Sequence, residues 1–313
     1  MKRVLIIRFS ALGDVAMINP VVRMAAEQNP EMEFTVLSQQ RMEDLFGGMP
    51  KNVIFHGVDL KKEPLRKIVA GLGRFDLVAD LHDVWRSRYI RIAMKLKGAR
   101  VRTIRKGRLA RFGLIHHIRT QALKHMTVRY AEVLQRLGLT ISDIKKAVHK
   151  ETGEGVGIAP FAAHKGKIYP LERMEKVVRL LSKSGERVVL FGGGEKEQEI
   201  LVTWAKKYKG VESVAGKYRL AEEMEIMRGL RVMVSMDSAN MHLASLVGTR
   251  VVSIWGATHP KAGFLGFGQS EGDCVQRDLK CRPCSIYGNK KCHFGDYRCM
   301  DIAPEKVKLR VER

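Results

Sequence analysis

The chain is poor in several residue types whose abundance would define a protein class. It has 5 Cys and 9 Pro among 313 residues. So few cysteines argue against a secreted, disulfide-bonded scaffold and favour a reducing, cytoplasmic setting. The low proline content excludes collagen-like and proline-rich low-complexity chains. No charge-free apolar run reaches the ~18 residues that a membrane-spanning helix needs, so we expect no such helix.

Acidic residues are also scarce. The chain has 33 Asp and Glu against 56 Lys and Arg, which gives a formal net charge of +23. Hydrophobic residues nevertheless make up 45% of the chain, enough for a packed core, so general disorder is excluded. The length is typical of two domains. The excess positive charge predicts a polyanionic partner, which would be nucleic acid, an anionic membrane surface or a phosphorylated substrate.

Short β-branched runs alternate with helical patterns, which predicts doubly wound parallel sheets. In the first half we expect strands at 4–9, 34–37, 53–55, 77–81 and 101–104, and helices at 15–28, 87–96 and 130–137. In the second half we expect strands at 155–161, 187–191, 232–235 and 251–255, and helices at 171–184, 195–207, 241–247 and 303–313.

The polar stretch 140–154 is the predicted linker between two Rossmann-like domains, 1–150 and 151–313. Ligands of such domains bind at the carboxyl ends of the strands, here in a central cleft.

The first strand of each half is followed by a loop with charged side chains. RFSALGDV places Asp14 between the first strand and the first helix, where it either caps that helix or acts as a general base on a substrate hydroxyl. FAAHKGKIYP places Lys165 and Lys167 after the first strand of the second half. These lysines are either solvated loop residues or partners of a phosphate group.

Two further loops in the second half carry candidate ligand-binding residues. LFGGGEKEQE contains Gly193, Glu195 and Glu197 and lacks both the GxGxxG and Walker patterns. It is an ordinary turn, or a close backbone approach to a ligand whose ribose the two glutamates bind. In VSMDSANMHLAS, the residues Asp237, Ser238, Ala239 and His242 lie where a strand ends and a helix begins, a geometry suited to a diphosphate.

The motifs RFSALGDV, KIYP and MDSANMHLAS…GTRVVSIWGATHP occur in this order along essentially the whole chain. Together they resemble glycosyltransferase family 9, the ADP-heptose:lipopolysaccharide heptosyltransferases, which have the GT-B fold. The resemblance implies inverting transfer of a heptose from an ADP-sugar to a lipopolysaccharide core or similar surface glycan. It also implies that the domain 1–150 binds the acceptor and the domain 151–313 binds the nucleotide-sugar. Asp14 matches the family's candidate base, and Lys167 the lysine of its K-x-W-P motif. Asp237, Ser238 and His242 match its D-[ST]-G-x-x-H segment.

Two departures from the family pattern concern the donor. Tyr169 replaces the Trp of the lysine motif, and Ala239 replaces a Gly, so that a β-carbon narrows the approach to the phosphates. The donor sugar therefore stays open, and another nucleotide-sugar enzyme of the GT-B fold is an alternative. The chain has no D-x-D triplet, so we expect catalysis without a metal ion or other cofactor, with Lys167 and a helix N-terminus stabilising the leaving group.

Four cysteines form a cluster in the sequence between the last strand and the last helix. Cys281, Cys284, Cys292 and Cys299 have the spacing C-x₂-C-x₇-C-x₆-C. A leading CxxC can belong to a structural zinc site, but the second pair departs from the usual knuckle spacing. Reduced, packed cysteines and a disulfide are the alternatives.

Residues 84–131 contain 14 Lys and Arg and no Asp or Glu. Apolar residues including Ile90, Leu109, Phe112 and Leu114 interleave with these charges, a pattern that favours peripheral docking at the inner face of the cytoplasmic membrane, or binding of an anionic glycolipid acceptor. The candidate contacts include Arg86, Arg88, Arg91 and Arg105. A basic nucleic-acid-binding protein is the competing class, but no known nucleic-acid-binding signature is present. A nicotinamide-dependent oxidoreductase lacks its fingerprint.

Overall fold

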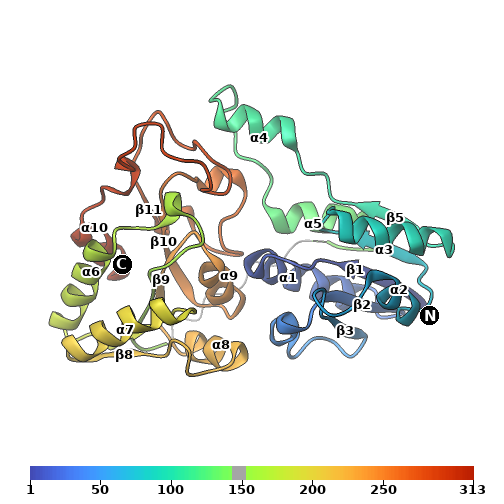
Figure 1. The fold of residues 1–313 in the computed structure, drawn as a ribbon, viewed down its shortest axis with the longest axis horizontal. Helices are drawn as coiled ribbons and strands as arrows, with labels where there is room; N and C mark the ends of the chain where they lie inside the picture. The colour runs from blue at the N-terminus through green and yellow to red at the C-terminus, as the bar shows by residue number, and fades with distance from the viewer. Residues whose placement is uncertain (143–152) are drawn as a thin grey trace. The chain divides into compact units, whose positions relative to one another are not determined.

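The structure is a computed structural model that describes residues 1–142 and 153–313. Its residues group into two compact units. The described residues 1–106 and 125–142 form the first unit, and 107–124 with 153–313 form the second (Figure 1). The predicted boundary at residue 150 and most of the predicted linker lie outside the described residues.

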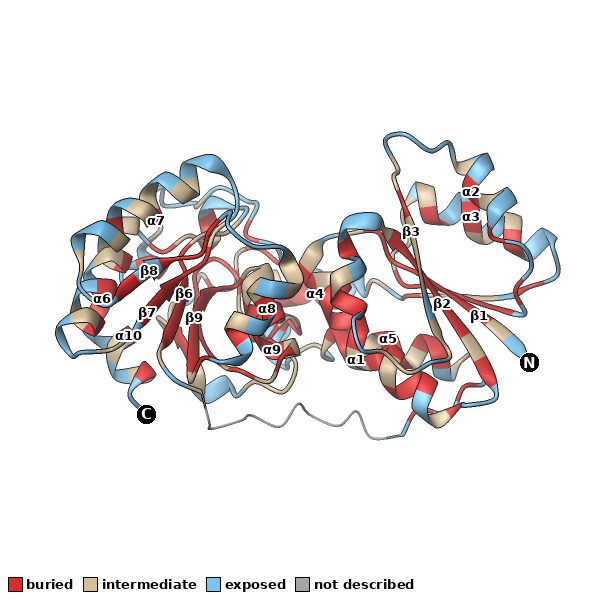
Figure 2. Ribbon diagram, turned by 90° about the horizontal axis from the view of Figure 1, so that it is seen from below, coloured by how far each residue is buried: buried red, intermediate tan, exposed pale blue. Residues whose placement is uncertain are grey.

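The first unit is a five-stranded sheet in the order β3-β2-β1-β4-β5, and every pair of neighbouring strands is parallel. The strands are β1 (Lys2–Ile7), β2 (Met32–Gln39), β3 (Val53–Val58), β4 (Leu77–Asp80) and β5 (Arg100–Thr103). The helices α1 (Leu12–Gln28) and α5 (Met126–Gln135) cover one face. The helices α2 (Leu65–Gly71) and α3 (Trp85–Leu96) cover the other (Figure 2).

Burial on both faces explains why β1 is a continuous apolar run. Residues 4–7 are completely buried, as expected for a parallel strand between two layers of helices. Leu5 and Ile7 pack in one cluster with Ile68 of α2 and Ile90 of α3. The strand order reverses between β1 and β4, and this is where Rossmann-like sheets bind ligands.

The second unit is a six-stranded, all-parallel sheet in the order β11-β10-β9-β6-β7-β8. The strands are β6 (Val156–Ala159), β7 (Val188–Leu190), β8 (Val211–Ser213), β9 (Val232–Met236), β10 (Arg250–Trp255) and β11 (Cys274–Gln276). The helices α6 (Leu171–Lys183), α7 (Glu195–Lys207) and α10 (Pro304–Val311) pack on one face. The helices α8 (Leu220–Arg228) and α9 (Ala239–Leu246) lie on the other face (Figure 2). The strand order reverses between β6 and β9.

Every strand and helix predicted above is present, with ends shifted by a few residues. The α/β class with two parallel sheets is therefore confirmed. The sequence did not predict β8, β11, α2, α4 or α8. β8 and β11 are edge strands of three residues, too short to give a periodic pattern.

The segment 107–124 does not follow the expected division at residue 150. Its helix α4 (Arg108–Ile115) packs in the second unit, where buried Leu114 contacts Ala262 and Ile286. The Leu123 N–H also donates to the Lys261 carbonyl at 2.8 Å. The acid-free stretch 84–131, expected to lie wholly in the first domain, is consequently shared between the two units.

Candidate functional site

Asp14 lies at the ligand-binding edge of the first sheet. It is in the first turn of α1, directly after β1, and its Oδ2 is 2.7 Å from Nη2 of Arg8. The Tyr130 hydroxyl, from α5, donates to Oδ1 at 3.5 Å, and the Ala11 N–H donates to Oδ2 at 3.4 Å. Asp14 therefore caps α1 and also presents an oriented carboxylate. Nothing in the sequence pattern pointed to Tyr130, because it is 116 residues away.

His82, which the sequence analysis did not single out, joins the loops after β1 and β4. Its Nδ1 accepts from the Phe9 N–H at 3.4 Å, and its Nε2 is 3.5 Å from the Ser10 hydroxyl. Burial, and after it the charge of Arg8, lowers the pKa of His82 to about 4. The imidazole next to Asp14 is therefore neutral at pH 7.

The second unit brings together two predicted residues from distant parts of the sequence. Nζ of Lys167, from the loop after β6, is 2.9 Å from Oδ2 of Asp237 at the end of β9. The side chains are 16% and 5% exposed. β6 and β9 are the strands between which the order reverses, so this ion pair lies where such a sheet binds its ligand.

The remaining residues of that motif begin α9. Ser238 is the N-cap residue and Ala239 is the first helical residue, while His242 is buried in the first turn with 8% of its surface exposed. The Ser238 hydroxyl makes no cap hydrogen bond and lies 3.4 Å from the Ser235 hydroxyl. The N–H groups of a first helical turn have no partner within the helix, and together with the helix dipole they attract an anion.

In the loop with the sequence LFGGGEKEQE, one glutamate has a different role from the one expected. Glu197, predicted to bind a ribose, accepts from the Gly193 N–H at 2.8 Å with its Oε2. Gln198 closes the same loop by donating to the Gly193 carbonyl at 2.7 Å. Glu197 thus stabilises its own βα turn, the ordinary-turn alternative. Glu195 is exposed as the first residue of α7 and keeps its predicted role as a candidate.

The loop that carries Lys167 contacts both the loop after β10 and the cysteine-containing segment 281–299. The Gly166 carbonyl accepts from the Ala257 N–H at 2.8 Å. A Cβ on Gly288 would lie 2.6 Å from Cγ of Lys167, so this glycine is what admits the lysine stem. Tyr169 is completely buried and donates its hydroxyl to the Ile302 carbonyl at 2.6 Å, and burial raises its pKa to about 12. The aromatic residue of the lysine motif is therefore an anchor of the loop.

The structure gives the zinc alternative no ligand set. All five cysteines are free thiols, and across residues 1–142 and 153–313 no three His, Cys, Asp or Glu side chains are grouped to hold a metal ion. Burial raises the pKa of the Cys299 thiol to about 11, so in this arrangement it is a neutral thiol at pH 7. The zinc alternative for Cys281, Cys284, Cys292 and Cys299 therefore gains no support from the described residues, in which these cysteines are free thiols.

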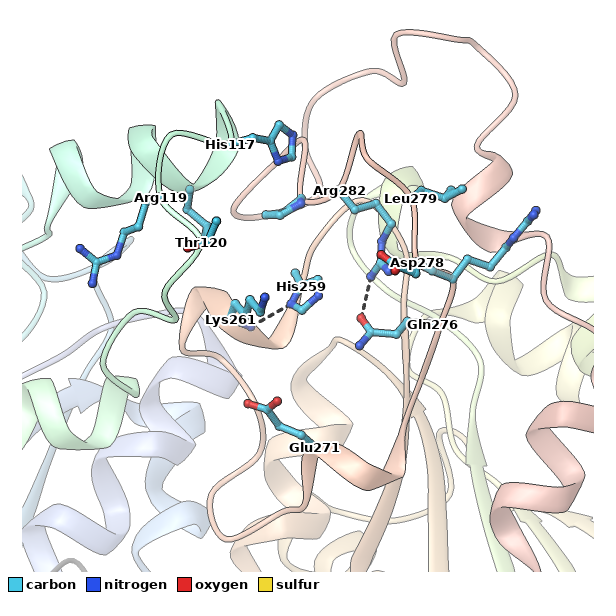
Figure 3. Close-up of a pocket in the computed structure, with 13 residues that line it drawn as sticks. His117, Arg119, Thr120, His259, Lys261, Glu271, Gln276, Asp278, Leu279 and Arg282 are labelled. Atoms are coloured by element: carbon cyan, nitrogen blue, oxygen red, sulfur yellow. Dashed lines mark hydrogen bonds between the residues drawn. The ribbon is translucent and has the colours of Figure 1, made fainter.

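A pocket of about 470 Å³ lies within the second unit, beside the ends of β10 and β11. One wall is the segment after α4, which carries His117, Arg119 and Thr120 (Figure 3). The opposite wall is formed by loops that carry His259, Lys261 and Arg282 (Figure 3). Neither Lys167 nor Asp237 lines it, so it is separate from the ion pair described above.

The four arginines predicted to bind an acceptor or a membrane differ in whether their guanidinium groups already pair with a carboxylate. Nη1 of Arg91 is 2.9 Å from Asp80 and 3.0 Å from Asp83, and Nε of Arg88 is 3.1 Å from Asp83. Burial alone would raise the pKa of Asp83, but the hydrogen bonds from Arg88 and Arg91 hold it below its usual value. Both arginines are therefore occupied by carboxylates, which the sequence could not show. The Arg86 guanidinium lies over the Trp85 ring, 4.7 Å from its centroid, and Arg105 is exposed.

An apolar stripe runs along the outer face of α3. Its members are strongly exposed apolar side chains spaced at one per helical turn: Trp85 (64%), Tyr89 (47%), Ile92 (56%) and Leu96 (85%). The residues of this helix that face the sheet, Ile90 and Met94, are buried, so the expectation that Ile90 lies among the surface charges is wrong. No helix in the described part of the chain is long and apolar enough to cross a membrane.

Two parallel α/β units, each with candidate residues where its strand order reverses, are the architecture of the GT-B fold class. A family model described as glycosyltransferase family 9 (heptosyltransferase) matches residues 66–294. The chain belongs to this family and is a glycosyltransferase.

Individual relatives agree with that assignment. Lipopolysaccharide heptosyltransferase 3 of Escherichia coli K12 is 24% identical over 281 residues, covering 79% of this chain and 80% of the relative. The glycosyl transferase family 9 structure from Veillonella parvula has a TM-score of 0.75 at 19% identity, covering 99% of this chain and 96% of that chain. The Escherichia coli heptosyltransferase WaaC, solved with ADP-2-deoxy-2-fluoro heptose, has a TM-score of 0.68 at 18% identity, covering 99% of both chains. These similarities confirm the GT-B fold.

Proposed function

We propose that this enzyme transfers a heptose, with inversion, from an ADP-sugar to a lipopolysaccharide core or a similar surface-glycan acceptor. The observation that carries the proposal is the ion pair of Lys167 with Asp237 at the β6/β9 reversal, beside the N-terminus of α9. A lysine next to exposed helix N–H groups is suited to the diphosphate of a nucleotide-sugar. The WaaC structure with an ADP-heptose analogue and the heptosyltransferase relative support ADP and heptose.

The chemistry divides between the two units. Asp14 takes the proton of the acceptor hydroxyl as its oxygen bonds to the anomeric carbon, and the bond from that carbon to the ADP oxygen breaks. Arg8 and Tyr130 hold the carboxylate in one orientation, which favours proton transfer along a fixed line. Negative charge that develops on ADP is stabilised by Lys167 and the α9 N-terminus.

Leaving-group stabilisation by these groups needs no added cation. We therefore expect transfer to continue in the presence of EDTA. Loss of activity that Mg²⁺ or Mn²⁺ alone restores would contradict this part of the proposal.

A second candidate is transfer of a different sugar from the same type of donor. Ala239, in place of the family's glycine, is half-buried at the start of α9. Its β-carbon takes up space next to the first-turn N–H groups, where a donor phosphate or sugar would approach. A donor whose sugar is smaller than heptose, or has a different shape, would fit beside this β-carbon.

The experiment that tests the proposed function is a thermal-shift screen of ADP-, UDP-, GDP- and CMP-sugars, followed by transfer assays with the best ligand. We expect ADP-heptose to stabilise the wild-type protein most. Lys167→Gln should weaken ADP binding about tenfold or more, because a charge-assisted phosphate contact is lost. Lys176→Gln, at an exposed position of α6, removes the same charge and should have no effect. Equal stabilisation by all nucleotides would contradict the proposed donor.

We also propose that the enzyme works at the inner face of the cytoplasmic membrane, in peripheral contact with anionic lipid. The stripe on α3 supports this contact, since aromatic and aliphatic side chains flanked by Arg86 and Lys95 are typical of interfacial helices. Helix α3 has no acidic residue to oppose a negative lipid surface. The acceptor is itself an anionic glycolipid, so the same contact would bring enzyme and acceptor together.

A further inference from the structure

Arg282, in the pocket of Figure 3, is a buried charge that makes no ion pair within the described residues. The charge of Asp278, which also lines the pocket, acts on it from beyond ion-pair distance. Only 7% of its surface is exposed. Its guanidinium donates to the Trp255 carbonyl at 3.2 Å, the Thr258 carbonyl at 2.9 Å and the Gln276 side chain at 3.0 Å. It also donates to the carbonyls of Gly256 and Arg277. Within the described part of the chain, no carboxylate lies within 4.0 Å of it.

Buried charges in proteins are normally paired, because an unpaired charge loses its hydration without gaining an opposite charge. Carbonyl dipoles satisfy the hydrogen bonds of Arg282 but leave its net charge. Burial accordingly lowers the pKa of this guanidinium. The pocket that Arg282 lines therefore has a buried positive charge in its wall, which an anion would neutralise.

The other polar groups of the pocket fit the same ligand. Lys261 is exposed and has no ion-pair partner in the described residues. His259 accepts from the Lys261 N–H at 3.1 Å with its Nδ1, and burial, with the charges of Arg282 and Lys261, lowers its pKa to about 4. Neutral His259 thus carries its proton on Nε2, where it is a hydrogen-bond donor.

The remaining charged residues of the lining do not reverse this balance. Arg277 pairs with Asp301 at 2.9 Å, and Arg119 donates its Nε to the Gln121 carbonyl at 3.1 Å. Glu271 and Asp278 also line the pocket, and both are exposed. The only buried charge of the lining is therefore the positive one on Arg282.

We propose that this pocket binds an anionic sugar, through a phosphate or carboxylate group carried by the acceptor. Its volume, about 470 Å³, is suited to one charged sugar residue and not to a whole glycolipid. The candidate donor residues lie elsewhere in the unit, which leaves the acceptor as the anionic substrate. This assignment to the acceptor rests on the proposed function, whereas binding of an anionic sugar does not.

The test is calorimetric binding of glucose 6-phosphate, glucuronate and uncharged glucose to the full chain without donor. We expect one or both anionic sugars to bind at least tenfold more tightly than glucose, and the tighter one identifies phosphate or carboxylate as the group recognised. Lys261→Gln should weaken that binding about threefold or more. His259→Asn keeps an acceptor for the Lys261 N–H and removes the Nε2 donor, so it should weaken binding similarly. Lys176→Gln is the charge-matched control.

Specific outcomes would overturn the proposal. Equal binding of glucose, no binding of either anionic sugar, or an equal loss in Lys176→Gln would remove the anion site. A loss of ADP affinity in the Lys261→Gln or His259→Asn variant would show that the pocket binds the donor, and would overturn its assignment to the acceptor. Failure of ADP binding in the wild-type protein, with the anionic sugar still bound, would instead contradict the proposed function and leave the pocket standing.

Discussion

At the scale of single residues, Asp14 combines two roles that are usually considered separately. Its carboxylate accepts the Ala11 N–H, which stabilises the start of α1, and it pairs with Arg8 at 2.7 Å. Asparagine keeps an oxygen for the cap but cannot take a proton from a hydroxyl. The helix role and the base role can therefore be tested apart.

We expect Asp14→Asn to reduce transfer by ~10²-fold or more, the usual contribution of a general base. ADP binding should stay within about twofold of the wild-type value, because the proposed donor residues belong to the second unit. Glu27→Gln, on an exposed position of the same helix, is the control and should leave both quantities unchanged. Single-turnover assays and calorimetry with ADP measure the two effects, and retained turnover would remove Asp14 from its role.

At the scale of elements, the cysteine-containing segment packs against the loop that carries Lys167. Gly288 has a positive φ of 75° and faces the stem of Lys167. Gly295 has a similar φ of 77°, but a Cβ there would meet nothing within 4 Å. The two glycines share this backbone conformation, but Gly288 is buried against the lysine whereas Gly295 is exposed.

Gly288→Ala and Gly295→Ala should consequently differ in function and not in backbone cost. Each should lose about 1 kcal/mol because a side chain is placed in the left-handed region, and Gly288→Ala should lose more, because its methyl group would also overlap Lys167. Only Gly288→Ala should raise the KM for the donor, by about tenfold, since its methyl group displaces Lys167. Chemical denaturation and initial-rate kinetics check this. An equal change of KM in both variants would show that strain alone is responsible.

The stripe on α3 gives a prediction of its own. Ile92→Ser combined with Leu96→Ser should weaken binding to vesicles that contain anionic lipid by about tenfold or more, since two exposed apolar side chains lose their burial in the interface. Turnover of a short soluble acceptor should not change. Leu309→Ser combined with Tyr218→Ser removes exposed apolar side chains of the second unit and serves as the control. Equal loss of vesicle binding in both pairs would contradict a specific surface on α3.

The elements also show which features could be predicted from the sequence and why others could not. Buried strands such as β1 and β9 are long apolar runs, so their positions, and hence the loops with Asp14 and Asp237, could be predicted. The pairing of Arg88 and Arg91 with Asp83 could not, because a charge pattern does not reveal which carboxylate turns toward it. The pocket around Arg282 could not either, since its walls come from segments far apart in sequence.

At the scale of the whole molecule, two half-buried histidines make the stability of the fold depend on pH. The pKa values of His82 and His259 are both lowered to about 4, mainly by burial, against about 6.5 in an unfolded chain. Between these values the unfolded state binds more protons than the folded state, so stability falls as the pH drops from 6.5 toward 4.

We therefore expect the melting temperature to decrease across this pH window. His82→Gln together with His259→Asn should make the decrease shallower. His293→Gln, at an exposed position, should leave its slope unchanged. Melting curves recorded at several pH values measure the effect, and an unaltered slope in the double variant would contradict it.

The segment 107–124 has a consequence for how the chain is made. Its helix α4 completes a small apolar cluster with Ala262 and Ile286, which are synthesised much later. During translation the segment therefore emerges with its basic and apolar side chains before the surface that covers them exists. A gene fragment that begins after the first unit would encode the second unit without this piece and leave that cluster open to solvent. A single cut in the gene therefore cannot separate the two units, because one fragment would carry the segment 107–124 and the other the residues that it packs against.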